Sequence, residues 1–124
     1  MSYFIVFVGS GIGGMLRHGV NVVSGHLVGH GFPAGTLVVN ILGSLFMGVL
    51  VGLFAFKGHG DHGLRLFLAT GVLGGFTTFS TFSLDAVTLY RRGELAAAAA
   101  YAVGSVTVSV GALVLGLYLV RRLI

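Results

Sequence analysis

Long apolar stretches joined by short polar links make up almost the whole chain. Four of them, at 3–23, 36–56, 64–90 and 95–120, account for most of the 124 residues. Each reaches or exceeds the ~20 residues that a helix needs to cross a bilayer. The pattern predicts an all-α membrane protein, residues 1–124, with four transmembrane helices in a single domain.

The third stretch contains a segment that a simple membrane helix would avoid. Gly74 and Gly75 weaken a helix, and the run FTTFST at 76–81 brings hydroxyls that can bond freed backbone groups. Within a bilayer, an open helix turn survives only if it is buried in protein or lines a wet cavity. We therefore expect the third helix to be broken mid-membrane, with loose carbonyls able to hold a small cation such as Na⁺.

Small and polar residues recur at helical spacing in the other stretches. The first stretch has candidate helix-packing residues, since small side chains let helix backbones approach in lipid: Gly9, Gly11, Gly13 and Gly14. The second and fourth stretches each carry residues four apart, which share one helix face: Asn40, Ser44, Gly48 and Gly52, then Tyr101, Ser105 and Ser109. These two faces indicate either a polar path or helix packing in which each serine bonds its own helix.

Two residue types in these stretches suit an anion. The Asn40 amide has two N–H donors, and an amide is costly to bury in a membrane without partners. It either joins two helices or binds a ligand. Phe79 and Phe82 are three residues apart on one helix face, and aromatic rings have electropositive edges that can face an anion. The alternative for both rings is packing or contact with lipid.

Composition supports a membrane protein and argues against several other classes. Hydrophobic residues form 56% of the chain and charged residues only 8%, and the mean hydropathy is +1.03. The formal charge of +4 comes from Arg and Lys at the ends of the stretches, which indicates anchoring at the membrane edge and not binding of nucleic acid. With no cysteine, no nucleophile–base pair and no paired carboxylates, an enzyme is not expected.

The positive charges are balanced between the two ends of the predicted bundle. Lys57, Arg65, Arg121 and Arg122 fall on one side, and Arg17, Arg91 and Arg92 on the other. Orientation normally follows an excess of Lys and Arg on the cytoplasmic side. Because the excess here is small, the chain is expected to insert both ways up and to pair with itself as an antiparallel, dual-topology homodimer.

Three motifs resemble the Fluc (CrcB) family of fluoride channels. They are GIGGMLR at 11–17, PAGTLVVNILGSLFMG at 33–48 and, most specific of all, GGFTTFSTFS at 74–83. The spaced Tyr101, Ser105 and Ser109 extend the match into the fourth stretch. Asp85 stands where the family more often has Glu.

The resemblance implies a passive channel that exports fluoride from the cytoplasm across the bacterial plasma (inner) membrane and so reduces fluoride toxicity. It implies an antiparallel dimer in the lipid bilayer with Na⁺ at its centre, held by the backbone carbonyls of Gly74 and Thr77. It places Arg17 near the entrance. It also implies a fluoride pore lined by Asn40, Phe79, Phe82, Ser80, Thr81, Tyr101, Ser105 and Ser109.

Two other functions remain open from the sequence. A small proton-coupled multidrug exporter would also have four spans, but it would need a carboxylate in its first span, and 3–23 contains none. A structural membrane subunit without transport of its own would tolerate Asn40→Asp, Phe79→Ile or Phe82→Ile with no change in ion flux.

Overall fold

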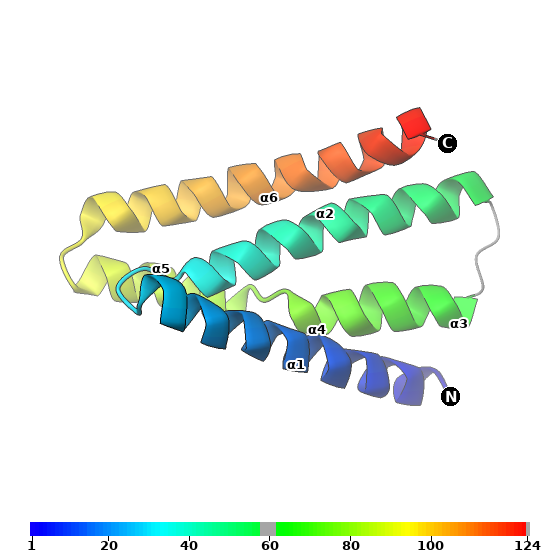
Figure 1. Cartoon of the computed structure of the whole chain (residues 1–124), viewed down its shortest axis with the longest axis horizontal. Helices are drawn as coiled ribbons and strands as arrows, with labels where there is room; N and C mark the ends of the chain where they lie inside the picture. The colour runs from blue at the N-terminus through cyan, green and yellow to red at the C-terminus, as the bar shows by residue number, and fades with distance from the viewer. Residues whose placement is uncertain (58–61, 124) are drawn as a thin grey trace.

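Helices joined by short links make up the described part of the chain. A computed structural model describes residues 1–57 and 62–123. Three long helices, α1 (Ser2–Val28), α2 (Ala34–Lys57) and α6 (Leu95–Leu123), accompany a segmented stretch (Figure 1). That stretch consists of α3 (His62–Arg65), the π-helix η1 (Leu66–Leu73), α4 (Gly74–Phe76) and α5 (Ser80–Arg91). The predicted all-α class is confirmed.

Three helical segments among the described residues are long and apolar enough to cross a membrane. They are Ala34–Ala55, His62–Arg91 and Leu95–Leu123, with mean hydropathies of 2.3, 1.3 and 2.1. Helix α1 has 27 residues and packs along η1 and α4, but it does not meet the same criterion. Length and composition therefore indicate a multi-pass protein, whereas a fourth span through α1 stays a prediction.

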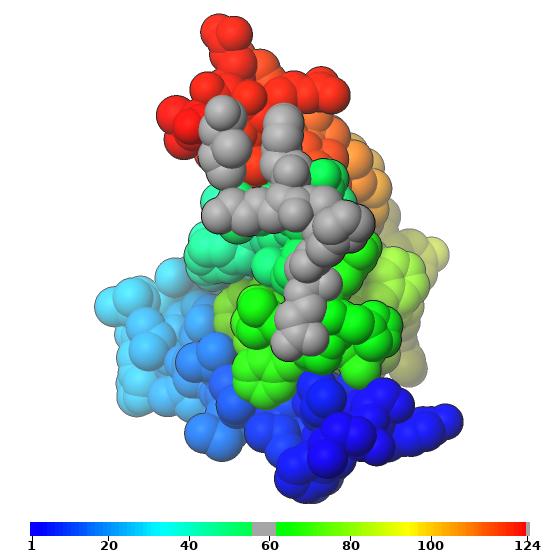
Figure 2. Space-filling model, turned by 90° about the vertical axis from the view of Figure 1, so that its right-hand side faces the viewer, coloured from blue at the N-terminus to red at the C-terminus, as the bar shows by residue number. Residues whose placement is uncertain are grey.

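The helices alternate in direction, so that both termini lie at one end (Figure 1). Seen from that end, α6, α2, the α3 end of the segmented stretch and α1 follow one another from top to bottom (Figure 2). As a result α2 and α6 run in the same direction, as do α1 and the segmented stretch. Each of these two parallel pairs is a main contact of the fold.

Glycines allow these parallel pairs to approach closely. A Cβ on Gly48 of α2 would overlap the Leu113 carbonyl of α6, and one on Gly9 of α1 would lie 2.7 Å from the Phe67 carbonyl oxygen. Gly13 also packs on η1, as predicted, whereas a side chain on Gly11 or Gly14 would meet open space within this chain. Such backbone contact is how helices associate where lipid offers no hydrophobic drive.

The third stretch is interrupted where the sequence predicts. Helix α4 ends at Phe76, Thr77 is extended with φ −89° and ψ 160°, and α5 begins only at Ser80. A Cβ on Gly75 would lie 2.5 Å from the Ser10 carbonyl oxygen, so that only glycine lets the break press against α1. The predicted break in the third helix is confirmed, and it faces α1 on one side and α2 on the other.

Candidate functional site

Asn40 of α2 is bonded to the break. Its Nδ2 donates to the Thr78 carbonyl oxygen at 3.0 Å, and the Thr78 N–H donates to Asn40 Oδ1 at 2.9 Å. The amide side chain thus pairs with the Thr78 backbone as a second peptide group would. Joining two helical segments is therefore an observed role of Asn40. The second N–H of its amide is not used in this pair.

The bonds at the break redirect two amide groups. In a continuous helix the Thr78 N–H would bond the Gly74 carbonyl and the Thr81 N–H would bond the Thr77 carbonyl. Here the Thr78 N–H bonds Asn40 Oδ1, and the Thr81 N–H bonds Thr78 Oγ1 at 3.2 Å. The Gly74 and Thr77 carbonyls consequently lose their helical donors, while both N–H groups keep an acceptor.

A cavity of about 340 Å³ opens beside the break, between α2, the break itself and α6. No charged side chain is among the described residues around it. Its lining consists of Asn40, Gly43, Ser44, Met47, Thr77, Thr78, Phe79, Phe82, Ser105, Val106, Ser109, Val110 and Leu113. The structure therefore brings the predicted pore residues Asn40, Phe79, Phe82, Ser105 and Ser109 to one cavity.

Two serine hydroxyls at this cavity are buried without a hydrogen-bond partner in the described part of the chain. These are Ser105 Oγ and Ser109 Oγ, and Ser105 as a whole is only 5% exposed. A hydroxyl within a helix usually bonds the carbonyl four residues earlier, as Thr107 does with Val103 on the same helix. An unmade bond of this kind costs about 1–3 kcal/mol. Simple back-bonding therefore does not describe these two serines.

Aromatic rings connect this cavity to the loop between α1 and α2. Phe79 is 76% exposed within the single chain, and its ring centroid lies 5.5 Å from that of Phe82. Phe82 lies 5.3 Å from the ring of Tyr101, which in turn meets Phe32 edge-on at 5.6 Å. Tyr101 is buried, and its hydroxyl donates to Asp85 Oδ2 at 3.1 Å.

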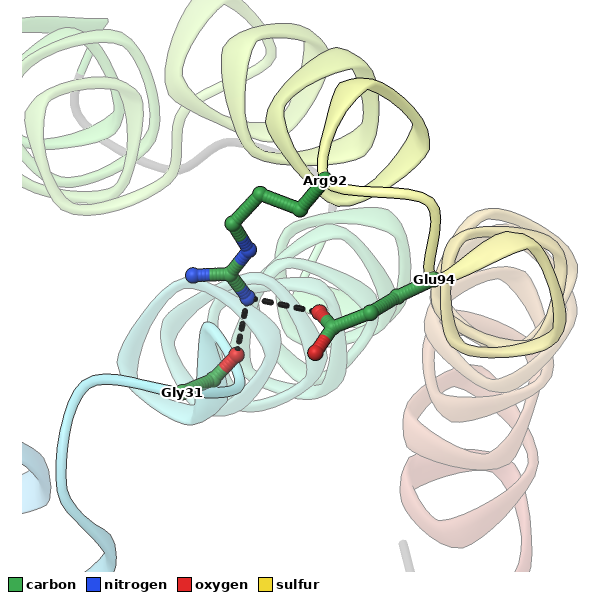
Figure 3. Close-up of polar contacts among 3 residues, drawn as sticks. All are labelled: Gly31, Arg92 and Glu94. Carbon is green, nitrogen blue, oxygen red and sulfur yellow. Dashed lines mark hydrogen bonds and ion pairs between the residues drawn. The ribbon is translucent and has the colours of Figure 1, made fainter.

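A second cavity of about 350 Å³ lies at the far end of this row of rings. Its lining includes polar and charged side chains, among them Thr81 and Asp85 of α5. Arg92, at the end of α5, also lines it and donates to the Gly31 carbonyl oxygen at 2.6 Å (Figure 3). Gly93, with φ 81°, turns the chain so that Glu94 pairs with Arg92 at 2.7 Å.

The remaining predicted residues are placed as follows. Ser80 is exposed at the start of α5, with its hydroxyl 3.4 Å from that of Thr78. Arg17 lies on α1, outside the residues that line the two cavities. Sequence analysis missed the role of Thr78, although a threonine three residues before a helical N–H is a common start signal for a helix. It also missed the pairing of Arg92 with Glu94.

These features define a class: a helical membrane protein whose interrupted helix borders an uncharged, hydroxyl-bearing cavity. The family model described as "CrcB-like protein, Camphor Resistance (CrcB)" matches residues 4–117. The Granulibacter bethesdensis "Fluoride-specific ion channel FluC" is 58% identical over all of this chain and 98% of that protein. The Rhodopseudomonas palustris (strain BisB5) protein of the same name is 51% identical over 99% of both chains.

The chain belongs to the CrcB/FluC family of fluoride-specific ion channels. A Beijerinckia indica relative with the same name is 55% identical over 96% of this chain and 95% of its own length. The resemblance read from the three motifs is therefore confirmed. The family consists of multi-pass membrane channels and not of enzymes, and the relatives named here are bacterial.

Proposed function

We propose that this protein is a passive, fluoride-selective channel that works as an antiparallel, dual-topology homodimer with four membrane-crossing helices in each chain. The observation that carries the proposal is the cavity beside the break, which is lined by Phe79, Phe82 and two serines, Ser105 and Ser109, whose buried hydroxyls have no partner among the described residues. Family membership names the ion, since the relatives are fluoride-specific channels.

The chemistry of the cavity suits a small, strongly hydrated anion. Such an ion gives up water only where donors replace it, and conduction requires binding that is weak enough for release. The Ser105 and Ser109 hydroxyls and the spare Asn40 N–H are neutral donors, and the phenylalanine ring edges are weakly electropositive. A neutral lining therefore replaces water without a fixed charge that would hold the ion.

A second copy of the chain completes each pore in this proposal. Phe79 is 76% exposed and the rest of α5 and α6 also presents apolar side chains, which favours a protein or lipid neighbour there. The balance of four against three basic residues permits a partner of opposite orientation. Ser80, Thr81 and Tyr101 extend the polar track from the cavity, and Arg17 attracts anions near the entrance.

The break also provides ligands for a structural Na⁺ at the dimer centre. The Gly74 and Thr77 carbonyls have lost their helical donors, and unwound backbone carbonyls of this kind coordinate Na⁺ in membrane proteins. The residues present therefore fit the cation. When bound, it would join the breaks of the two chains through these carbonyls.

In a bacterial plasma membrane, such a channel exports fluoride and reduces its toxicity. Hydrogen fluoride enters from an acid medium and releases fluoride at the neutral pH of the cytoplasm. The membrane potential, worth about 2.3 kcal/mol per charge per 100 mV, drives the anion outward. No further energy source is needed.

Ion efflux from liposomes tests this function. The purified protein is reconstituted into liposomes loaded with K⁺ fluoride or K⁺ chloride, and valinomycin is added so that K⁺ compensates the charge. An ion-selective electrode should record rapid loss of fluoride and retention of chloride, with neither ion lost from protein-free liposomes. Equal loss of both ions, or no fluoride efflux from protein shown to be folded, would refute the proposal.

A further inference from the structure

We infer that Asn40 and Thr78 form a clamp that frees the Gly74 and Thr77 carbonyls for the cation. The side chains of Asn40 and Thr78 are then positioning residues, because they hold the site in shape but do not themselves ligate the cation. The inference rests on the channel function proposed above. It gives Asn40 a task besides donating to fluoride, and it gives Thr78 a task that the pore does not require.

The first arm of the clamp is the pair of bonds between Asn40 and Thr78. Asn40 Oδ1 accepts the Thr78 N–H at 2.9 Å, and Asn40 Nδ2 donates to the Thr78 carbonyl at 3.0 Å. An amide side chain has both a donor and an acceptor, which lets it replace a peptide group on both sides. As long as these bonds persist, the Thr78 N–H does not return to the Gly74 carbonyl.

The second arm is the Thr78 hydroxyl. Its Oγ1 accepts the Thr81 N–H at 3.2 Å, in the manner of a helix-capping residue. This bond keeps the Thr81 N–H away from the Thr77 carbonyl. Each arm therefore releases one carbonyl oxygen and at the same time satisfies the amide that would otherwise have been left without an acceptor.

The surroundings keep Thr77 and its released carbonyl in place. Gly43 of α2 lies against the Thr77 methyl group, where a Cβ would overlap that methyl. The Thr77 N–H and hydroxyl both donate to the Leu73 carbonyl, at 3.0 and 3.1 Å. Thr77 is thus fixed at its amide, its hydroxyl and its methyl, while its carbonyl has no helical donor. An arrangement of this kind suits a cation site that exists before the ion binds.

The test measures sodium and not fluoride. The melting temperature of the purified full-length protein is recorded while Na⁺ replaces N-methyl-D-glucamine at constant ionic strength, which gives the Na⁺ concentration for half of the stabilisation. Thr78→Val keeps the shape but removes the acceptor, so that this concentration should rise at least about tenfold. Thr78→Ser restores the hydroxyl and should stay within about twofold of the parent protein.

Two further variants complete the design. Asn40→Ala removes the other arm and should raise the half-stabilising Na⁺ concentration in the same way, which keeps the test decisive if Thr78→Val does not fold. Ser83→Ala is the matched control, because the Ser83 hydroxyl bonds the nearby Phe79 carbonyl and frees neither cation ligand. This control should leave the Na⁺ dependence unchanged.

The outcomes separate this inference from the channel function. Fluoride efflux together with an unchanged Na⁺ dependence in folded Thr78→Val or Asn40→Ala would overturn the clamp and leave the channel standing. Fluoride efflux with no effect of Na⁺ on the parent protein would overturn the cation site, and the clamp with it. Absence of fluoride efflux from a protein stabilised by Na⁺ would instead count against the channel.

Discussion

The two cavities differ in the charge of the side chains that line them. The cavity at the loop end is polar, and its charged groups have partners: Arg92 pairs with Glu94, and Asp85 accepts from Tyr101. The cavity beside the break has no charged side chain among the described residues that line it, yet Ser105 and Ser109 have hydroxyls without partners. Charged groups are thus ion-paired or hydrogen-bonded at one cavity, and neutral donors are left unused at the other.

The difference indicates where each kind of group is useful to a conducted ion. Fixed charges such as those at the loop-end cavity act over roughly 10 Å at 0.1 M salt and raise the local concentration of ions of opposite sign. At the cavity beside the break a full charge would hold the ion, whereas hydroxyls can replace its water and still release it. Phe82 and Tyr101, with ring centroids 5.3 Å apart, are the middle members of the row of rings that runs from Phe79 at one cavity to Phe32 at the other.

Removing the Phe82 ring should have the largest effect on fluoride efflux. In Phe82→Ile the apolar bulk stays but the ring edge is lost, together with its contacts to Phe79 and Tyr101. Each of these tilted ring contacts is worth about 1 kcal/mol, so that the two together exceed the roughly 1.4 kcal/mol that corresponds to tenfold in rate. We expect fluoride efflux from liposomes to fall by about tenfold or more, while size-exclusion chromatography still shows the assembled protein.

Phe4→Ile is the control for that variant. Phe4 is 62% exposed near the start of α1 and lies outside both cavities, so its replacement should leave efflux unchanged. Undiminished fluoride efflux in Phe82→Ile would show that this ring is not part of the ion pathway. It would also show that the row of rings does not link the two cavities in conduction.

The unpaired hydroxyls should produce an effect of opposite sign on stability and on flux. Ser105→Ala removes a buried oxygen that has no partner within residues 1–57 and 62–123, which relieves a cost of about 1–3 kcal/mol, so that the melting temperature should rise. The same change removes a donor from the pathway, and we expect fluoride efflux to fall by about fivefold. Fluoride efflux and thermal unfolding of the same preparation check both expectations.

Thr107→Val provides the comparison on the same helix. The Thr107 hydroxyl bonds the Val103 carbonyl of its own helix and lies outside the cavity lining. Its removal should leave fluoride efflux unchanged and should not raise the melting temperature. A loss of stability in Ser105→Ala would mean that its hydroxyl has a partner in the assembled protein, and the contrast between the two cavities would weaken.

The two regions also differ in how far the sequence predicts them. The break follows from local chemistry, because a glycine pair and a run of hydroxyl residues weaken a helix wherever they occur. The serine and phenylalanine positions follow from helical spacing, which identifies a shared face. Helical spacing does not identify the neighbour of that face, and Arg17, expected at the entrance, lies outside both cavities.

The contacts that complete each region depend on tertiary structure. Asn40 and Thr78 are 38 residues apart, and Tyr101 and Asp85 are 16 apart. No local pattern specifies such pairs, since they depend on how the helices pack against one another. The missing partner of Ser105 is also invisible in the sequence, because Thr107, two residues away on the same helix, does bond its own backbone.

The smallest effect should come from the charge pair at the loop-end cavity. Glu94 offsets Arg92, which lines the polar cavity, and both side chains are about half exposed at 50% and 43%. Glu94→Gln leaves the Arg92 charge uncompensated while its bond to the Gly31 carbonyl can remain. The local potential for anions becomes more favourable, so that fluoride efflux should rise by about twofold at low ionic strength. It should return to the parent rate when an impermeant salt shortens the Debye length.

Glu94→Asp is the control for that variant, because it keeps the charge and should change efflux little. If fluoride efflux in Glu94→Gln rose equally at all salt concentrations, the cause would be an altered loop and not the electrostatic potential at the loop-end cavity. Only an electrostatic effect is screened by salt.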